Sequence, residues 1–216
     1  MDDHQLLTDA LSRVLEREPD IEVVGVAPTV GAVRDAPRWD LDVALMDYRL
    51  PDGTGSEATR IVKSRWPAAK VVMLTAIADD ETVLESIRAG ADGYLTKDRA
   101  VTDVVRAVRD AYAGEILLPR SVIVDIARRV VASRDHSPEH SLVEPLTQRE
   151  LEVLRSLTEG LATRQICERL GISANTLRTH VQNIMGKLHV HSKLEAVAFG
   201  LRHRLVDPPR AEGTSS

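Results

Sequence analysis

Five residues in the first half of the chain have the types and spacing of a phosphoryl-transfer site. Asp2 and Asp3 stand near the N-terminus, and Asp47, Thr75 and Lys97 each end a short, largely apolar run. Three carboxylates held close together repel one another unless a cation joins them, and Mg²⁺ is the hard, oxygen-preferring ion that suits such a set. One carboxylate can then attack phosphorus while the metal and the lysine neutralise charge, and the threonine can hydrogen-bond the phosphoryl group. The set predicts that Asp47 is phosphorylated beside Mg²⁺.

The elements that must position these residues alternate between helix and strand. Apolar positions at helical spacing predict helices over 5–17, about 30–36, 56–66, 80–89 and 101–113. Short apolar runs predict strands at 21–26, 43–46, 71–74 and 93–96. Strands that are apolar throughout indicate a doubly wound α/β fold, with a parallel sheet covered on both faces. Functional residues of such sheets lie beyond the carboxyl ends of the strands, where Asp47, Thr75 and Lys97 stand.

A connector separates this first domain, residues 1–113, from a second one. Residues 114–145 are predicted to be helical over 119–133 and a flexible linker over 134–145, where charge, Ser, His and Pro occur without an apolar period. Residues 146–206 are predicted to form four helices, and 207–216 a disordered tail. The helix ends are marked by capping boxes, N-cap candidates and C-cap glycines: Thr147 with Glu150, Ser192 with Glu195, Thr163, Ser173, Gly160 and Gly171.

Charge also divides the chain. Residues 1–113 hold 14 Lys and Arg against 21 Asp and Glu, a net charge of −7, whereas residues 147–206 hold 9 against 5, a net charge of +4. A basic second domain favours a polyanionic partner such as DNA. The sequence has no apolar run of the roughly 18 residues that a membrane span needs, which predicts a soluble protein. The single cysteine, Cys167, fits the reducing cytoplasm.

Residues 1–113 resemble the response-regulator receiver domain, a flavodoxin-like fold, and the whole of 1–206 resembles the NarL/FixJ family. The resemblance rests on Asp2-Asp3-His4, Met46-Asp47-Tyr48-Arg49-Leu50-Pro51-Asp52-Gly53, Leu74-Thr75-Ala76 and Gly90-Ala91-Asp92-Gly93-Tyr94-Leu95-Thr96-Lys97. It implies that Asp47 is the phosphoacceptor, that Asp2, Asp3 and the carbonyl of Arg49 help to hold Mg²⁺, and that Tyr94 is a switch residue. By the same resemblance Tyr94 turns inward as Thr75 moves toward the phosphoryl group.

Residues 146–206 resemble a LuxR-type helix-turn-helix domain. Its central unit is Ala162-Thr163-Arg164-Gln165-Ile166-Cys167-Glu168-Arg169-Leu170-Gly171-Ile172-Ser173, and a recognition helix follows from Ala174 to about Leu188. Arg178, Thr179 and Gln182 are predicted to read base edges. The predicted phosphate contacts are Asn175, Thr176, Asn183, Lys187 and Lys193. The family uses the last helix for dimerisation; here Leu194, Val197, Ala198 and Leu201 supply either that face or the domain's own core.

One part of the receiver pattern is missing. In the family a strand of five or six residues precedes the aspartate pair, and here only Met1 stands before it. That strand is central in the usual order 2-1-3-4-5, so without it the strands at 21–27 and 42–47 would each present an open edge. We therefore expect a first strand that is truncated, and a true start upstream of Met1.

These features predict a DNA-binding transcriptional regulator that a sensor histidine kinase phosphorylates on Asp47 and that forms homodimers when phosphorylated. It would not be an enzyme with a dedicated substrate. The main alternative is a phosphorylation-independent DNA-binding regulator with a degraded receiver. A lactone sensor would need an aromatic-lined pocket, for which the first half offers only scattered aromatic residues. A phosphatase would need a second catalytic carboxylate where Arg49 stands.

Overall fold

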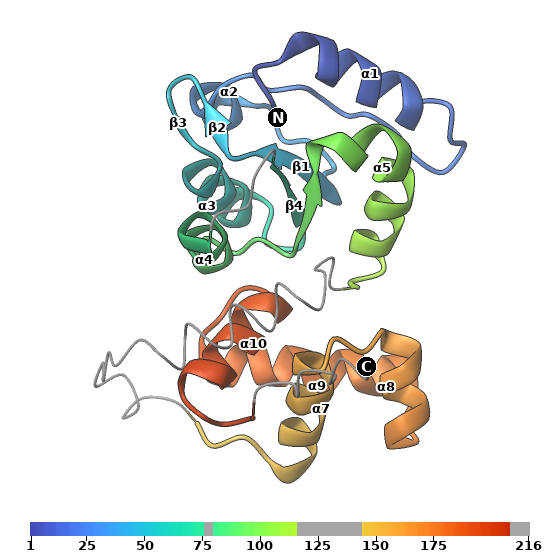
Figure 1. The fold of residues 1–216 in the computed structure, drawn as a ribbon, viewed down its shortest axis with the longest axis vertical. Helices are drawn as coiled ribbons and strands as arrows, with labels where there is room; N and C mark the ends of the chain where they lie inside the picture. Colours follow the sequence, from blue (N-terminus) through green and yellow to red (C-terminus); the bar gives the residue numbers. More distant parts are fainter. Residues whose placement is uncertain (76–79, 116–143, 208–216) are drawn as a thin grey trace, which may run out of the picture. The chain divides into compact units, whose positions relative to one another are not determined.

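The computed structural model describes residues 1–75, 80–115 and 144–207 (Figure 1). The chain forms two compact units, residues 1–117 and 118–216, and each is described by itself. The predicted helix over 119–133, most of the predicted linker and the tail from 208 onward lie outside the described residues.

The first unit alternates helices with strands, as the apolar pattern predicts. Its elements are α1 (Gln5–Leu15), α2 (Val30–Asp35), β1 (Val43–Asp47), β2 (Arg49–Leu50), β3 (Gly53–Thr54), α3 (Gly55–Arg65), β4 (Lys70–Thr75), α4 (Asp80–Arg88), β5 (Gly93–Thr96) and α5 (Lys97–Tyr112). One boundary differs clearly from its prediction, because α5 begins at Lys97 and not at 101.

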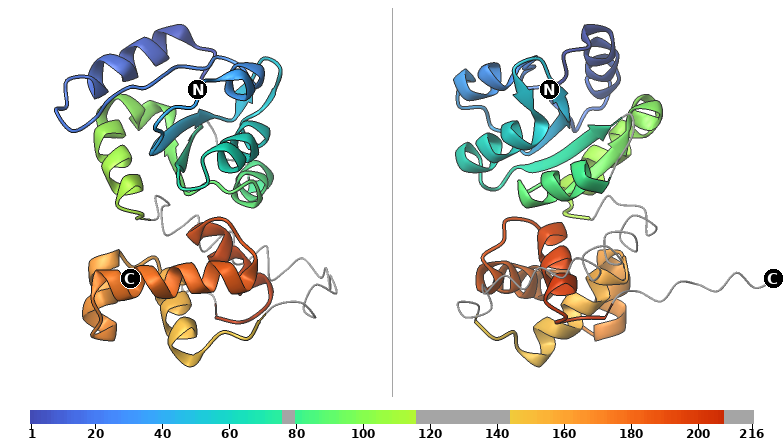
Figure 2. Two further views of the ribbon diagram at one scale, coloured as in Figure 1. Left: turned by 180° about the vertical axis from the view of Figure 1, so that it is seen from behind. Right: turned by 60° about the vertical axis from the view of Figure 1, so that its left-hand side comes forward.

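Three of these strands form a parallel sheet in the order β1-β4-β5, and β2 and β3 form a separate antiparallel pair. Helices α2 and α3 pack on one face of the sheet, against Met46 and Met73, and α1 and α5 pack on the other, against Leu74 (Figure 2). Alternate residues of each strand therefore face different helices. In β4 the residues Val71–Leu74 are at most 1% exposed, as expected for a strand with a neighbour on each side.

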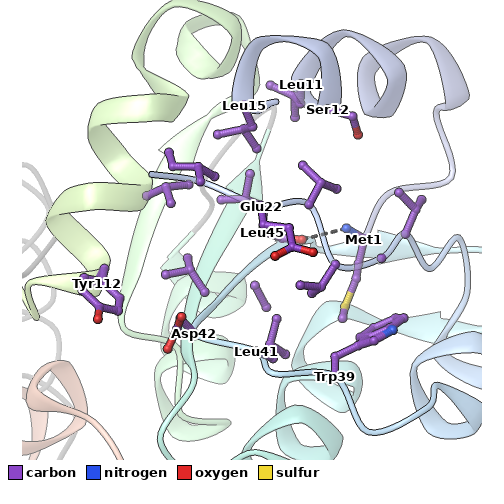
Figure 3. Close-up of a pocket in the computed structure, with 18 of the residues that line it drawn as sticks. Met1, Leu11, Ser12, Leu15, Glu22, Trp39, Leu41, Asp42, Leu45 and Tyr112 are labelled. Carbon is purple, nitrogen blue, oxygen red and sulfur yellow. Dashed lines mark hydrogen bonds between the residues drawn. The ribbon is translucent and has the colours of Figure 1, made fainter. Parts of the chain in front are cut away.

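The predicted strand at 21–26 is not a strand in the structure. Residues 21–27 carry no secondary structure, and no hydrogen bond joins the backbone of 22–27 to another backbone group within the described residues. The physical reason is that a strand requires a partner's backbone beside it. On the side of β1 that faces these residues, the one described backbone that forms such bonds is that of Met1, and it bonds to β1 (Figure 3).

The second unit contains the four predicted helices, α7 (Gln148–Thr158), α8 (Thr163–Leu170), α9 (Ala174–Leu188) and α10 (Lys193–Arg202). The capping box of Thr147 and Glu150 forms at the start of α7, and Ser173 caps α9. Thr163 is the first residue of α8 and not its N-cap, which is Ala162.

The turn between α8 and α9 depends on a glycine. Gly171 has a φ of 62°, in the left-handed region that side chains disfavour, and it ends α8 so that α9 can begin three residues later. The core-facing residues predicted on α9, Leu177, Val181, Ile184 and Leu188, are all at most 5% exposed. The opposite face of α9 is left open to solvent.

Candidate functional site

The three sheet strands end together and place the predicted phosphoryl-transfer residues at one edge. Asp47 is the last residue of β1, Thr75 is the last residue of β4, and Lys97 follows directly after β5. The parallel register sets Asp47 beside Leu74 and Thr75 beside Thr96. The side chain of Thr75 is outside the described part of the structure.

Lys97 connects two carboxylates. Its Nζ lies 2.6 Å from Asp47 Oδ2 and 2.9 Å from Asp2 Oδ2. Both aspartates are 4% exposed, so water screens these charges little. Burial works to lower the pKa of Lys97, but its contacts with Asp47 and Asp2 prevail and raise it. Burial likewise works to raise the pKa of Asp2, but Lys97 and the backbone N–H of His4 hold it below its usual value.

The acidic residues gather closely enough to share a cation. Asp2, Asp3, His4 and Asp47 each offer one ligand atom, and these atoms lie within 4.8 Å of one another. The contact of Lys97 with Asp2 Oδ2 lacks hydrogen-bond geometry, so within the described residues this buried oxygen has no hydrogen-bond partner. An oxygen held by an ion pair alone keeps lone pairs for a further ligand, and carboxylate oxygens suit Mg²⁺. The residues present therefore fit the ion that the sequence predicts.

His4 is a member of this cluster to which sequence analysis assigned no role. Its Nδ1 lies 3.0 Å from Asp2 Oδ1 and 2.9 Å from Asp3 Oδ1. A single histidine beside two aspartates gives no spacing signal in the sequence, so only the fold reveals this contact.

The Met1 amine lies next to the same carboxylates. It donates to the carbonyl oxygen of Leu45 at 2.8 Å, and the carbonyl of Met1 accepts from the Asp47 N–H at 2.8 Å. Burial lowers the pKa of this amine to about 6, although the negative charges of Asp2 and Asp47 act in the opposite direction. A large fraction of the amine is therefore neutral at pH 7.

A glycine allows α3 to begin directly behind the phosphoacceptor. A Cβ on Gly55 would lie 2.2 Å from the carbonyl oxygen of Asp47 and 2.9 Å from Cα of Tyr48. Any larger residue would push the end of β1 out of place. Arg49, whose carbonyl is a predicted metal ligand, lies in β2 with its side chain exposed.

Two tyrosines connect the site to α4. Tyr94, the predicted switch residue, is partly buried on β5 and donates its hydroxyl to the carbonyl oxygen of Val83 at 2.9 Å. Burial raises the pKa of Tyr94, so it stays protonated. Tyr48, next to the phosphoacceptor, donates to Glu85 Oε2 at 2.8 Å. No local pattern in the sequence indicates this second connection, because its partners are 37 residues apart.

The second unit presents the predicted DNA-reading residues on the open face of α9. Arg178, Thr179 and Gln182 are all exposed. Of the predicted phosphate contacts Asn175, Thr176 and Asn183 are exposed, whereas Lys187 and Lys193 are partly buried.

Lys187 has a structural partner. Its Nζ lies 2.8 Å from Oε2 of Glu150, whose side chain is 3% exposed, and 3.5 Å from the carbonyl oxygen of Pro145. Burial works to raise the pKa of Glu150, but the bonds from Lys187 and from the N–H of Thr147 hold it below its usual value. The pair joins the start of α7 to the end of α9.

The apolar face of α10 closes the core of its own domain. Leu194, Val197 and Leu201 are at most 2% exposed within the single chain, and Ala198 is half-buried. The sequence left two roles open for these residues, a dimerisation face or the core of their own domain, and their burial within the single chain supports the core.

Comparisons with known proteins agree with both units. A family model described as "Response regulator receiver domain" matches residues 1–109, and one described as "Bacterial regulatory proteins, luxR family" matches residues 144–199. The chain is 34% identical over 207 residues to the response regulator protein VraR of Staphylococcus epidermidis, which covers 95% of this chain and 96% of the relative.

Solved structures include a LuxR-family two-component response regulator from Aurantimonas, 30% identical, with a TM-score of 0.51 over 60% of this chain and 94% of that one. The RcsB response regulator of Salmonella typhimurium shares the fold at 23% identity, with a TM-score of 0.50 over 92% of this chain and 94% of that one. The chain described here therefore belongs to the response-regulator family, as a two-component regulator with a receiver domain and a LuxR-type DNA-binding domain.

Proposed function

We propose that Asp47 is the phosphoacceptor of this regulator and that its phosphorylation by a sensor histidine kinase controls DNA binding by α9. The observation that carries the proposal is the position of Lys97 Nζ, within 3 Å of both Asp47 and Asp2. The ammonium group of a lysine held between two buried carboxylates at the edge of the sheet can stabilise the negative charge that a phosphoryl group adds to one of them.

In the proposed reaction a carboxylate oxygen of Asp47 attacks the phosphorus of a phosphohistidine or a small acyl phosphate. The bond from phosphorus to the leaving group breaks as the aspartyl–phosphate bond forms. Lys97 stabilises the charge on the transferred oxygens, and Thr75 donates a hydrogen bond once the group has arrived. Mg²⁺, held by Asp2, Asp3, Asp47 and the carbonyl of Arg49, would neutralise charge during this transfer. Beyond its own dephosphorylation the protein is proposed to turn over no substrate.

The switch is proposed to run through α4. The Tyr94 hydroxyl already bonds to Val83 at the start of this helix, and Tyr48 bonds to Glu85. A phosphoryl group that draws Thr75 and Lys97 inward would change the packing around both tyrosines. The phosphoryl group shifts the balance between the two conformations of the receiver only to the extent that it interacts more favourably with one of them.

For DNA, Arg178, Thr179 and Gln182 are proposed to read base edges from the exposed face of α9. Asn175, Thr176, Asn183 and Lys193 would contact phosphates. Lys187 can contact a phosphate only through the ammonium protons that do not bond to Glu150. We propose that the active form is a homodimer on an operator of two half-sites, and that the protein works in the cytoplasm. No helix in the described ranges is long and apolar enough to cross a membrane.

A titration of DNA binding tests this proposal. Duplexes selected from a random pool are bound by the full chain with and without acetyl phosphate and Mg²⁺, at several salt concentrations. We expect acetyl phosphate to tighten binding by the wild type but not by Asp47→Asn, and Arg178→Ala to weaken it by about 1–3 kcal/mol. Equal, phosphate-independent binding by both proteins would favour the alternative, a DNA-binding regulator with a degraded receiver.

A further inference from the structure

The turn between β2 and β3 is tied to α2 by the side chain of Asp52. Its two carboxylate oxygens accept hydrogen bonds from the backbone N–H groups of Val30 and Gly31, at 2.7 and 2.8 Å. These partners are 22 and 21 residues away in the sequence, and Figure 1 shows β2 and β3 beside α2. Asp52 therefore links the segment that follows the phosphoacceptor to a helix that precedes it in the chain.

The start of α2 is a firm point of attachment. Val30 and Val33 are 2% and 0% exposed, and they pack in one core cluster with Met46 of β1. The end of the helix is held as well, because Arg65 of α3 donates to the carbonyl oxygen of Val33 at 2.9 Å. Closely packed cores yield little to displacement. A group bonded to the start of α2 is therefore held in place relative to β1, which ends in Asp47.

The turn that Asp52 holds is weakly supported by its own strands. β2 and β3 form two residue pairs, Arg49 with Thr54 and Leu50 with Gly53. So short a pair of strands is at best marginally stable by itself. Leu50 is 8% exposed and packs in the core, whereas Asp52 at the tip is exposed. The bonds of Asp52 thus join an exposed turn to a buried helix.

Two independent caps serve the first turn of α2. One is local, because the hydroxyl of Thr29 accepts from the N–H of Ala32 at 3.0 Å. The other is Asp52, which faces the positive end of the helix. The N–H groups of Gly31 and Val30 hold the pKa of Asp52 below its usual value, and hydrogen bonds to an ionised acceptor are stronger than those to a neutral one. The cap by Asp52 also holds the β2–β3 turn, whereas the cap by Thr29 is confined to α2.

We propose that Asp52 is a positioning residue for the metal site. By tying the β2–β3 turn to α2 it holds the carbonyl of Arg49, the first residue of β2, in place relative to Asp47. The inference rests on the proposed function, in which this carbonyl and Asp47 both bind Mg²⁺. Mg²⁺ demands near-octahedral geometry at short distances, so a displaced ligand weakens its binding. Asp52 does not bind the ion itself, because both of its oxygens are bonded to α2.

Calorimetric titration of the full chain with magnesium chloride tests this role. The variants are Asp52→Ala, which removes both bonds, and Asp52→Asn, which keeps one acceptor oxygen. The matched control is Thr29→Ala, which removes the local cap from the same helical turn and leaves the β2–β3 turn bonded. Amide hydrogen exchange over residues 49–54 and the unfolding midpoint are measured for each protein.

We expect Asp52→Ala to bind Mg²⁺ about tenfold more weakly than the wild type, as is typical when a residue that orients a metal ligand is lost. Its amides over 49–54 should exchange faster, and Asp52→Asn should lose less affinity. Thr29→Ala should lower the unfolding midpoint but keep the Mg²⁺ affinity of the wild type. Unchanged affinity in Asp52→Ala, or an equal loss in Thr29→Ala, would overturn the inference.

Failure of the proposed function has a different signature. Asp47 would then take up no phosphoryl group from acetyl phosphate, while Asp52→Ala still bound Mg²⁺ more weakly than Thr29→Ala, and that result would uphold the role of Asp52. A wild type with no affinity for Mg²⁺ at millimolar concentrations would overturn the role of Asp52 as well.

Discussion

Replacing Lys187 with methionine should destabilise the DNA-binding domain selectively. The change keeps a long apolar stem and removes the ammonium from Glu150, whose side chain is 3% exposed. Breaking a buried ion pair by removing one partner costs about 3–5 kcal/mol. Here the Lys187 side chain is 23% exposed and Glu150 keeps the N–H of Thr147 at 2.7 Å, so we expect a loss of about 2 kcal/mol.

The chain offers a way to observe this domain separately. Both tryptophans and all three tyrosines lie in residues 1–113, so fluorescence reports the receiver, whereas circular dichroism at the helical minimum reports both units. Lys187→Met should lower the dichroism midpoint of the second unit by roughly 10 °C. The fluorescence midpoint should stay unchanged. A matched control is Arg164→Met, because Arg164 forms an exposed pair with Glu168 that should contribute little.

Acid provides a second check with a defined sign. The folded-state pKa of Glu150 is depressed, so its pair contributes fully above the ordinary carboxyl pKa and is lost as pH falls through the folded value. The difference between wild type and Lys187→Met should therefore begin to shrink as the pH falls below the ordinary glutamate pKa of about 4.3, and it should vanish only below the depressed pKa of Glu150 in the folded protein. A variant as stable as the wild type at pH 7, or a deficit that persists in acid, would refute the reasoning. If Lys187 also contacts a phosphate, the salt slope of DNA binding should fall by about 0.9 in this variant.

Three further outcomes follow from the receiver site. Lys97→Gln should slow phosphorylation by acetyl phosphate about 10²-fold, measured on phosphate-affinity gels, because it removes the cation beside Asp47; an unchanged rate would exclude that role. Gly55→Ala should lower the tryptophan fluorescence midpoint strongly and slow phosphorylation, because the added Cβ meets the Asp47 carbonyl, and wild-type behaviour would show that α3 shifts freely. Burial lowers the pKa of the Met1 amine in the folded chain, so the free energy of unfolding should be highest above about pH 8 and should fall by up to about 3 kcal/mol toward pH 6. Denaturant titrations at several pH values can follow this fall. Extending the chain at the Met1 nitrogen should remove the pH dependence, and a dependence that persists would contradict this reasoning.

Regular elements were largely predictable, because each repeats a local signal. The periodic leucines and valines of α1 and α9 predict those helices, and Gly171 predicts the turn before α9 through a backbone conformation that other residues disfavour. The strand at 21–26 was predicted wrongly because strand propensity says nothing about whether a partner is present.

Pairings between distant residues were less accessible. The register of β1, β4 and β5 brings Asp47 and Lys97 together, and the rule about strand ends was enough to anticipate that edge. The contact of His4 with the aspartates and the pair of Lys187 with Glu150 depend on how side chains turn after the fold has formed. The sequence does not distinguish an exposed lysine from one in a buried ion pair, so Lys187 was predicted to contact DNA alone.

The most direct test of the central claim is the intact mass of the full chain after incubation with acetyl phosphate and Mg²⁺. We expect the addition of one phosphoryl group, which requires Mg²⁺ and does not occur in Asp47→Asn. A wild type that gains no phosphoryl group under these conditions, or an Asp47→Asn protein that gains the same one, would contradict the assignment of Asp47.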